Sequence, residues 1–356
     1  MTRSISTVDL FCGAGGLTHG FEQAGLPVKA GYDIDPACKF PYEHNNKAKF
    51  ILQDVANITG SDLAEHFSTS SINILAGCAP CQPFSSYSRR YNDQQLKWKL
   101  GRDFARLIEE CQPEVISMEN VLQLKHHSVF DEFINLLKKL NYCFESYEVN
   151  CLDYGIPQSR KRLVLLASKF GKINLIPATH HLEQYKTVRQ TIEHLEPLSA
   201  GQASKKDWLH RCSKLSELNQ RRIRASKPGG TWRDWPQNLI AECHLKKSGK
   251  TYPGVYGRME WDKPSPTITT QCFGFGNGRF GHPEQDRAIS LREAALLQTF
   301  PPAYQFVDPD KPVAIDIVGR LIGNAVPVKL GQVIAQSILN HIEEFSYGGP
   351  TIDESK

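Results

Sequence analysis

Cys78 and Cys81 form a Cys-x-x-Cys pair in the run Gly-Cys-Ala-Pro-Cys-Gln-Pro-Phe-Ser of residues 77–85. This spacing is compatible with a zinc site, a redox pair, a small buried apolar residue or a thiolate nucleophile. No second such pair and no suitably spaced Cys or His partners follow, so we expect no metal. Cys81 stands between Pro80 and Pro83, which restrict the backbone. The pair alone leaves the redox, core and nucleophile interpretations open.

Three charged residues further along the chain could assist a nucleophile. Glu119 follows a predicted strand at 114–118, where it could exchange a proton with a substrate or serve as a capping or salt-bridged carboxylate. Arg160 and Arg162 alternate along the start of another strand, so we expect them to point the same way. They could hold a phosphate or an oxyanion, or be solvated.

A glycine-rich turn follows the first predicted strand, residues 5–10. Its sequence is Phe-Cys-Gly-Ala-Gly-Gly-Leu (11–17), and it leads into a helical pattern. Glycines let a ligand approach the backbone, and a helix N-terminus favours a negative group. Asp33 and Asp54 end the next two strands, where they could accept hydrogen bonds from ribose hydroxyls and an adenine amino group. The pattern lacks the Gly-x-Gly-x-x-Gly spacing, so an adenosine-containing ligand and a simple tight turn both remain open.

The elements that must position these residues alternate between strands and helices. Because of this alternation we predict an α/β fold with a Rossmann-like, largely parallel, doubly wound sheet. The polar residues fall at the carboxyl ends of strands, where such sheets bind ligands. Strands are predicted at 5–10, 28–32, 50–52, 72–77, 114–118, 143–151 and 163–167, and helices at 17–24, 36–45, 104–110 and 130–140.

The character of the chain changes after about residue 172, where Pro, Gly and Trp become frequent and periodicity weakens. This predicts a second domain of short strands and loops that extends to about residue 286, followed by helices at 291–298 and 329–343. Residues 202–263 contain fourteen Lys or Arg and six Asp or Glu, so this segment carries +8 and the rest of the chain −4. Such a segment is typical of a polyanion-binding module, although charge alone allows a solvated basic face equally.

The composition is that of an ordinary globular protein, with 40% hydrophobic and 22% charged residues among 356. The chain starts without the apolar segment of a secretory signal, and no apolar run approaches the ~18 residues of a membrane helix. The ten cysteines are scattered, which favours reduced thiols. We therefore expect a cytoplasmic protein.

Six motifs, taken in their order along nearly the whole chain, resemble those of the DNA cytosine-5 methyltransferases. They are Asp9-Leu-Phe-Cys-Gly-Ala-Gly-Gly16, Pro80-Cys-Gln-Pro-Phe-Ser85, Glu119-Asn-Val121, Gln158-Ser-Arg-Lys-Arg162, Arg292-Glu293 followed by Leu297-Gln-Thr-Phe-Pro301, and Gly323-Asn-Ala-Val-Pro327. The resemblance implies a Rossmann-like methyltransferase domain of residues 1–171 plus 287–345. It further implies a smaller, irregular target recognition domain of residues 172–286 and a flexible tail of residues 346–356, with the terminal helix beside the first strand and helix.

The activity that the resemblance implies is methyl transfer from S-adenosylmethionine to C5 of cytosine in a specific duplex DNA sequence, with S-adenosylhomocysteine as the product. Cys81 would attack C6 of a flipped-out cytosine, Glu119 would contact N3 and the amino group, and Arg162, with Arg160 in the same catalytic set, would hold O2. The attack is needed because C5 is a poor nucleophile until a thiolate adds at C6. On this interpretation Cys78 is incidental.

The resemblance also implies the binding residues. The cofactor pocket would be lined by Asp9, Phe11, Gly13, Gly15, Gly16, Leu17, Asp33, Ile34, Asp54, Val55, Pro80, Leu100, Asn324 and Ala325. DNA would be contacted by Ser85, Arg89, Arg90, Arg233, Arg258, Thr267 and Thr269.

The implied biology is a bacterial or phage modification enzyme that works on nucleoid DNA. It would act as a monomer without an obligatory protein partner and would protect host DNA from a cognate restriction endonuclease that acts separately. Two rivals share the motifs: a tRNA cytosine-5 methyltransferase, against which the basic insert counts, and a non-catalytic DNA-binding relative, against which the intact Cys81, Glu119 and Arg162 count. A redox protein would not need the later motifs.

Overall fold

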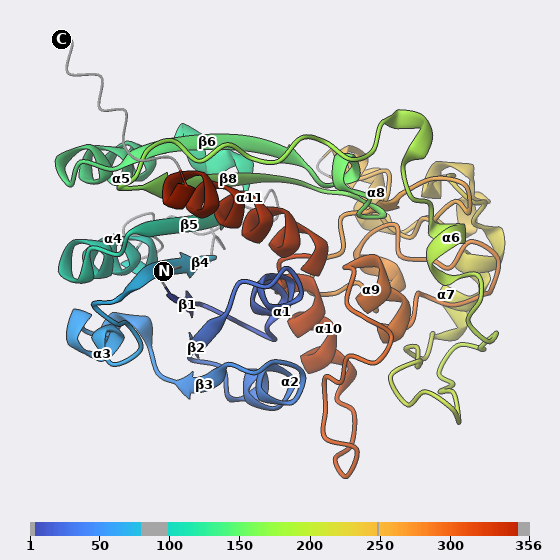
Figure 1. Cartoon of the computed structure of the whole chain (residues 1–356). Coiled ribbons are helices and arrows are strands. Elements are labelled where there is room, and N and C mark those ends of the chain that lie inside the picture. Colours follow the sequence, from blue (N-terminus) through green and yellow to red (C-terminus); the bar gives the residue numbers. More distant parts are fainter. Residues whose placement is uncertain (1–3, 80–98, 248, 348–356) are drawn as a thin grey trace. The chain divides into compact units, whose positions relative to one another are not determined.

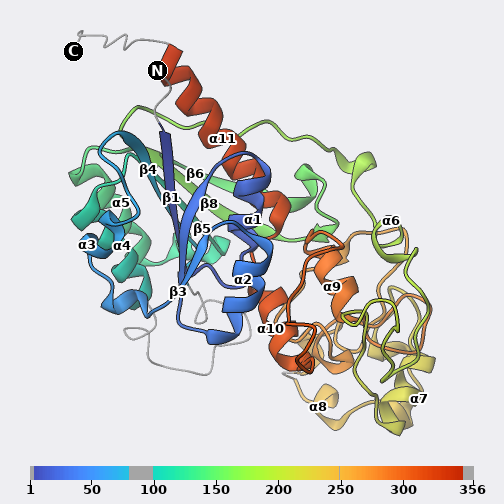
Figure 2. The same ribbon diagram turned by 60° about the horizontal axis from the view of Figure 1, so that its bottom comes forward.

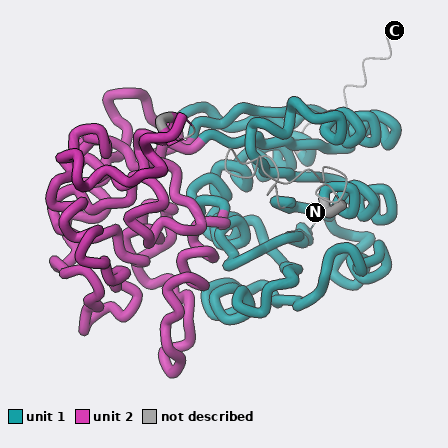
Figure 3. The backbone as a smooth tube through the Cα atoms, turned by 180° about the vertical axis from the view of Figure 1, so that it is seen from behind, with its two compact units in different colours: residues 1–150, 161–178, 326–356 teal, residues 151–160, 179–325 magenta. Residues whose placement is uncertain are grey.

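The computed structural model describes residues 4–79, 99–247 and 249–347, which form two compact units (Figures 1 and 3). Unit 1 contains residues 1–150, 161–178 and 326–356, and unit 2 contains residues 151–160 and 179–325. The chain therefore passes between the units four times. The division differs from the predicted domain boundaries, because residues 151–160 and 287–325 belong to unit 2 and residues 172–178 to unit 1. The functional boundaries 1–171 plus 287–345 and 172–286 stay predictions.

Unit 1 is built on a seven-stranded sheet with the order β3-β2-β1-β4-β5-β8-β6. Neighbouring strands from β3 to β5 run parallel, whereas β8 is antiparallel to both β5 and β6. The predicted α/β class and the largely parallel sheet are confirmed, and the reversal of β8 is the feature that alternation did not reveal. The strands are β1 (Ser4–Leu10), β2 (Val28–Asp33), β3 (Lys49–Leu52), β4 (Ser71–Gly77), β5 (Val115–Asn120), β6 (Cys143–Asn150) and β8 (Lys161–Ser168).

Helices cover both faces of this sheet (Figure 2). On one face lie α3 (Gly60–Ala64), α4 (Lys99–Cys111) and α5 (Ser128–Lys139), and on the other lie α1 (Gly16–Gln23), α2 (Lys39–Asn45) and α11 (Val328–Tyr347). The terminal helix α11 packs on α1, as predicted. This contact requires glycine at position 20, because a Cβ there would stand 2.3 Å from the carbonyl oxygen of Val328.

The core of unit 1 explains why these segments form a sheet with helices on it. Strand residues such as Val8, Leu75 and Ile116 are fully buried against Leu107 of α4 and Leu137 of α5. Burying each such side chain contributes about 1.5–3 kcal/mol. The segment 163–167 of β8 is fully buried on both faces, which is what a strand inside a sheet covered by two helix layers demands.

Unit 2 has little sheet. Its described strands are β7 (Gln158–Ser159) and β9 (Ser265–Pro266), which pair in parallel over two residues each. The predicted domain of short strands and loops is therefore correct for the loops, whereas short helices stand in place of most of the expected strands, around a core that contains Trp232 and Trp235. The helices are α6 (Val188–Ile192), α7 (Glu217–Ala225), α8 (Glu242–Leu245), α9 (Leu291–Leu297) and α10 (Ile315–Asn324).

A buried ion pair stabilises the α9 end of unit 2. Arg287 and Glu293 are 0% and 1% exposed, and both oxygens of Glu293 accept hydrogen bonds of 2.7 Å from the Arg287 guanidinium. Burial alone would raise the pKa of Glu293, but Arg287 outweighs it and holds this pKa below its ordinary value. Glu293 also accepts from the backbone N–H of Ser290, so the pair anchors the first turn of α9.

Candidate active site

The glycine-rich loop leaves β1 in a left-handed backbone conformation. Phe11, Gly13 and Gly15 have φ of 59°, 53° and 86°. Gly15 is the N-cap of α1, and the N–H of Gly13 donates to Oδ2 of Asp33 at 2.9 Å. The predicted loop thus forms at the carboxyl end of β1 and is held by the acidic residue that ends β2.

Two aspartates shape this loop in different ways. Asp33 is half-buried, its other oxygen accepts from the N–H of Asp35 at 2.9 Å, and burial raises its pKa. Asp9 is 1% exposed and accepts a 2.7 Å hydrogen bond from the Thr18 hydroxyl, while burial raises its pKa to about 7. Asp9, which was predicted to line the cofactor pocket, therefore lies inside the fold and supports the loop from behind.

Apolar side chains stand exposed beside the loop. Ile34 is 66% exposed directly after β2, and Leu52 is 53% exposed at the end of β3. The two lie close together because Asp33 and Leu52 pair in the parallel ladder. Asp54 accepts from the N–H of Ala56 and caps the following turn. Exposed aliphatic surface next to carboxylates and backbone N–H groups suits a flat heterocycle with attached hydroxyls. Leu52 was not predicted as a site residue, although the sequence predicts it at the end of a strand.

The other predicted members of the loop are arranged around its base. Leu17 is 4% exposed in the first turn of α1, and Val55 is 3% exposed. Gly16 is the first residue of α1 and is buried. These residues give the loop its support, so the surface open to a ligand comes from Phe11, Gly13 and the exposed side chains at the ends of β2 and β3.

A second cluster stands at the ends of β4 and β5 and the start of β8. Glu119 is 2% exposed, and its Oε1 lies 3.0 Å from Nε of Arg162. This ion pair has hydrogen-bond distance without hydrogen-bond alignment, so among the described residues Oε1 accepts no hydrogen bond. The sequence predicted that Glu119 and Arg162 belong to one site, and the ladder, which pairs Glu119 with Val164, brings them together.

Cys78 is the member of this cluster that the sequence missed. Its thiol donates to Oε2 of Glu119, with Sγ and Oε2 2.7 Å apart, and its N–H donates to the carbonyl of Leu10 at 3.4 Å. The interpretation of Cys78 as incidental did not foresee this contact with Glu119. The usable signal was the parallel register: Gly77 of β4 pairs with Met118 of β5, so the next residues, Cys78 and Glu119, must be neighbours.

Several predicted residues belong to the stretch 80–98, which lies outside the described residues. They are Pro80, Cys81, Ser85, Arg89 and Arg90. Their flanks are described: Ala79 accepts a 3.2 Å hydrogen bond from the amide of Asn120, and the chain is described again from Lys99, where α4 starts. Leu100 falls in the first turn of α4.

Arg160 is separate from the Arg162 pair. It belongs to unit 2, is 4% exposed, and donates to the carbonyls of Ile268 at 3.2 Å and Ala325 at 3.4 Å. The expectation that Arg160 and Arg162 act together on a substrate is corrected here, since Arg160 is committed to the backbone of its own unit. Asn324 is exposed at the last residue of α10, and Ala325 is 8% exposed.

The motif residue Gln158 holds unit 2 together. Its amide donates to Oε1 of Gln298 at 2.9 Å, and its own oxygen accepts from the N–H of Ile268 at 2.9 Å. Gln298 in turn donates to the carbonyls of Ile322 and Ala325. Buried amide groups therefore link the later motifs to one another, a structural role that the sequence motifs did not predict.

The predicted DNA-contacting residues of unit 2 differ in exposure. Arg233 and Thr269 are exposed, with the Arg233 guanidinium 5.4 Å from the Trp232 ring centre. The Thr267 hydroxyl donates to the carbonyl of Ser159 at 2.7 Å.

Arg258 contradicts its predicted role as a DNA contact. It is 5% exposed, and all three of its nitrogens donate to partners inside unit 2. The partners are the carbonyls of Ile223, Ser226, His282 and Gln285 and the carboxylate of Asp286. Arg258 is a structural cross-link.

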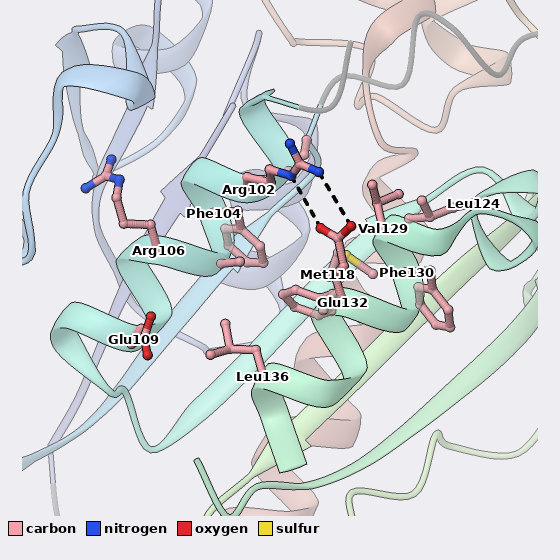
Figure 4. A pocket seen from close by; sticks show the side chains of 14 residues that line it. Arg102, Phe104, Arg106, Glu109, Met118, Leu124, Val129, Phe130, Glu132 and Leu136 are labelled. Carbon is pink, nitrogen blue, oxygen red and sulfur yellow. Dashed lines mark hydrogen bonds and ion pairs between the residues drawn. The ribbon is translucent and has the colours of Figure 1, made fainter. Parts of the chain in front are cut away.

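A cavity of about 240 Å³ lies between α4 and α5 (Figure 4). Phe104, Met118 and Leu136 give it an apolar lining, and Arg102 pairs with Glu132 at 3.3 Å at its edge. Its apolar walls set it apart from the polar clusters at the strand ends. Among the described residues no three His, Cys, Asp or Glu side chains gather as around a metal ion, and no helix of that part of the chain is long and apolar enough to cross a membrane.

The seven-stranded sheet with its strand-end clusters has the fold of the Rossmann-like methyltransferases. A crystal structure of a prophage-encoded DNA modification methyltransferase from E. coli matches with a TM-score of 0.73 at 22% identity, covering 96% of this chain and 100% of that chain. The Type II methylase M.HgiDII of Herpetosiphon aurantiacus is 53% identical over 341 residues, or 95% of this chain and 96% of its own. The Type II methyltransferase M1.HphI of Haemophilus parahaemolyticus is 31% identical over 343 residues, or 94% and 87%.

The model of the C-5 cytosine-specific DNA methylases matches residues 5–340. The chain therefore belongs to this family and is a DNA (cytosine-5) methyltransferase of the Type II modification enzymes. The resemblance read from the six motifs is confirmed.

Proposed function

We propose that the protein methylates C5 of one cytosine in a specific duplex DNA sequence through a covalent adduct between Cys81 and C6 of a flipped-out base. The observation that carries the proposal is the state of Glu119. A buried carboxylate oxygen without a hydrogen-bond donor costs about 1–3 kcal/mol, and such exceptions in folded proteins call for an explanation. Oε1 of Glu119 is such an atom among the described residues. A cytosine edge, with its N3 and amino group, would complete it.

The residues of the chain divide the work as follows. The thiolate of Cys81 donates an electron pair to C6, and Glu119, which would face N3 and the amino group, relieves the charge that moves toward N3. The guanidinium of Arg162, already 3.0 Å from Glu119, holds the O2 side of the ring. After methylation the C5 proton passes to a solvent water, and its electron pair re-forms the C5–C6 double bond as the C6–S bond breaks, so Cys81 regains its thiolate. Extrusion of the base costs a few kcal/mol that DNA contacts must offset.

The methyl donor that fits unit 1 is S-adenosylmethionine. It supplies an electrophilic methyl group on a sulfonium. The left-handed loop at Gly13 and Gly15, the carboxylate of Asp33 and the exposed side chains of Ile34 and Leu52 are the residues that would hold its adenosine part. Asp54, Asn324 and the backbone of Ala325 remain proposed contacts.

The target sequence would be read by unit 2, whose exposed Arg233 and Thr269 remain the proposed contacts to DNA. We also propose that the enzyme acts as a monomer on bacterial nucleoid DNA and protects it from a separate endonuclease.

The first experiment expresses the wild-type protein in cells and maps 5-methylcytosine by bisulfite sequencing. Methylation of one cytosine in a fixed sequence is expected. Methylation found only in tRNA would overturn the assignment of DNA as the substrate. An absence of methylation from every nucleic acid would overturn the methyltransferase activity itself.

The second experiment compares Cys81→Ser with a control, Cys143→Ser, which changes an exposed cysteine on β6. Cys81→Ser should lose methyl transfer and retain DNA binding, while the control keeps both. Turnover by Cys81→Ser at the wild-type rate would rule out the covalent mechanism. Exchanging residues 172–286 with those of a relative should change the methylated sequence.

A further inference from the structure

The thiol of Cys78 contacts one of the two carboxylate oxygens of Glu119. Each carboxylate oxygen of Glu119 has a different neighbour: Oε2 accepts from Cys78 at 2.7 Å, and Oε1 faces Arg162 without an aligned hydrogen bond. A carboxylate turns easily about its last side-chain bond, because that torsion is broad and nearly two-fold. The two oxygens are chemically equivalent, so a donor on one of them fixes the plane of the carboxylate and the direction in which the other oxygen points.

We propose that Cys78 is a positioning residue that fixes the Glu119 carboxylate with Oε1 free to meet the cytosine. This inference rests on the proposed function and adds a residue to its site. The thiol is a weak donor toward neutral acceptors, but a charged carboxylate strengthens the bond.

The backbone makes Cys78 rigid enough for this role. Its N–H donates to Leu10 at the end of β1, and the following residue, Ala79, accepts from the Asn120 amide. Cys78 is therefore tied on both sides at the point where β4 ends, and its Cβ direction is set by the sheet rather than by a loop. Glu119 lies at the neighbouring position of β5. The donor and the acceptor are thus both carried by rigid strands, which is the arrangement that precise orientation needs.

The role predicts a defined pattern among variants. Cys78→Ala removes the donor on Oε2 and leaves the ion pair with Arg162 as the remaining described contact of the carboxylate, so the single-turnover rate of methyl transfer should fall about tenfold, the factor expected for one lost hydrogen bond. The KM for DNA should stay within about twofold, because the phosphate and groove contacts are untouched. Cys78→Ser restores a donor of similar size and should recover most of the rate.

A matched control separates positioning from packing. Cys111 of α4 is, like Cys78, a partly buried cysteine of unit 1, so Cys111→Ala removes the same atoms away from Glu119. It should keep the wild-type rate per folded molecule. All rates are divided by the concentration of protein that binds DNA, so a loss of folded protein is not counted as a loss of rate.

The outcomes are distinct. Slow transfer by Cys78→Ala, recovered by Cys78→Ser at unchanged KM, supports the inference. Equal rates for Cys78→Ala and wild type would overturn the inference about Cys78 and leave the proposed function intact. A Cys78→Ser variant as slow as Cys78→Ala would have the same consequence. If the wild-type protein itself transfers no methyl group in the same assay, the proposed function fails instead.

Discussion

Replacing the buried carboxyl of Asp9 by an amide should stabilise unit 1 at neutral and alkaline pH. Asp9→Asn keeps an oxygen that accepts the Thr18 hydroxyl, so the substitution removes the charge and retains the hydrogen bond. Burial raises the pKa of Asp9 from its ordinary value of 3.8 to about 7. In the folded protein the carboxyl therefore stays protonated up to about pH 7, whereas in the unfolded chain it ionises near pH 4.

The sign and size of the effect follow from proton linkage. Between about pH 4 and pH 7 the folded state binds one more proton than the unfolded state at Asp9, so this contribution to stability is complete below pH 4 and is lost as the pH rises through 7. The difference between pKa 3.8 and about 7 corresponds to about 4 kcal/mol. The free energy of unfolding of Asp9→Asn should match that of the wild type near pH 4, exceed it increasingly between pH 4 and pH 7, and stay about 4 kcal/mol higher above pH 7.

Hydrogen–deuterium exchange of the β1 amides measures this in unit 1 itself, with each rate corrected for its intrinsic pH dependence. The control is Asp131→Asn, since Asp131 is exposed in the first turn of α5. Its difference from the wild type should not vary with pH. A difference for Asp9→Asn that is constant with pH, or that favours the wild type at high pH, would refute the claim that burial keeps this carboxyl protonated.

Three further substitutions test other contacts. Gly20→Ala should lower the free energy of unfolding of unit 1 by about 1–3 kcal/mol, because a Cβ would press on the Val328 carbonyl; a stabilisation in urea unfolding would contradict this packing. Glu293→Gln should cost unit 2 about 3–5 kcal/mol, because Arg287 is left buried without its counter-charge, and an unchanged urea midpoint would dismiss the ion pair as a support. Asp33→Ala should weaken S-adenosylmethionine binding at least about tenfold in calorimetry, because charge-assisted hydrogen bonds are lost, and unaltered affinity would remove Asp33 from the proposed pocket.

Much of unit 1 could be predicted because its signals are local. Alternating apolar segments predict strands and helices one at a time. Glu119 lies at the edge where the parallel strands end, whereas Arg162, at the start of β8, reaches that edge only because β8 is antiparallel to β5. The reversal of β8 could not be predicted, since it depends on where the chain returns from unit 2. In unit 2 the helix from Ile315 to Asn324 was not predicted, although its apolar residues recur at helical spacing.

Which charged residues are buried could not be predicted from the sequence. Arg258 and Arg160 look like any basic residues that could meet a polyanion, but both are 5% or less exposed and donate to carbonyls of their own unit. Arg233, in the same kind of basic context, is exposed. An arginine is buried where irregular loops leave backbone carbonyl groups without another donor. The positions of these carbonyl groups are set by tertiary packing, which leaves no periodic pattern in the sequence.

Cys78 also joins the two halves of the site in unit 1. Its N–H reaches Leu10, the last residue of β1 before the glycine-rich loop, and its thiol reaches Glu119 at the end of β5. Cys78 follows the strand between β1 and β5 and contacts both sides of the proposed site. On one side is the end of β1, where the loop that would hold the methyl donor begins, and on the other is the carboxylate that would hold the cytosine. Because β4 lies between β1 and β5, a displacement at its end would alter both sides at once. Methyl transfer demands that donor and acceptor atoms be held at a fixed separation, and a shared rigid strand end provides that more directly than two independent loops could.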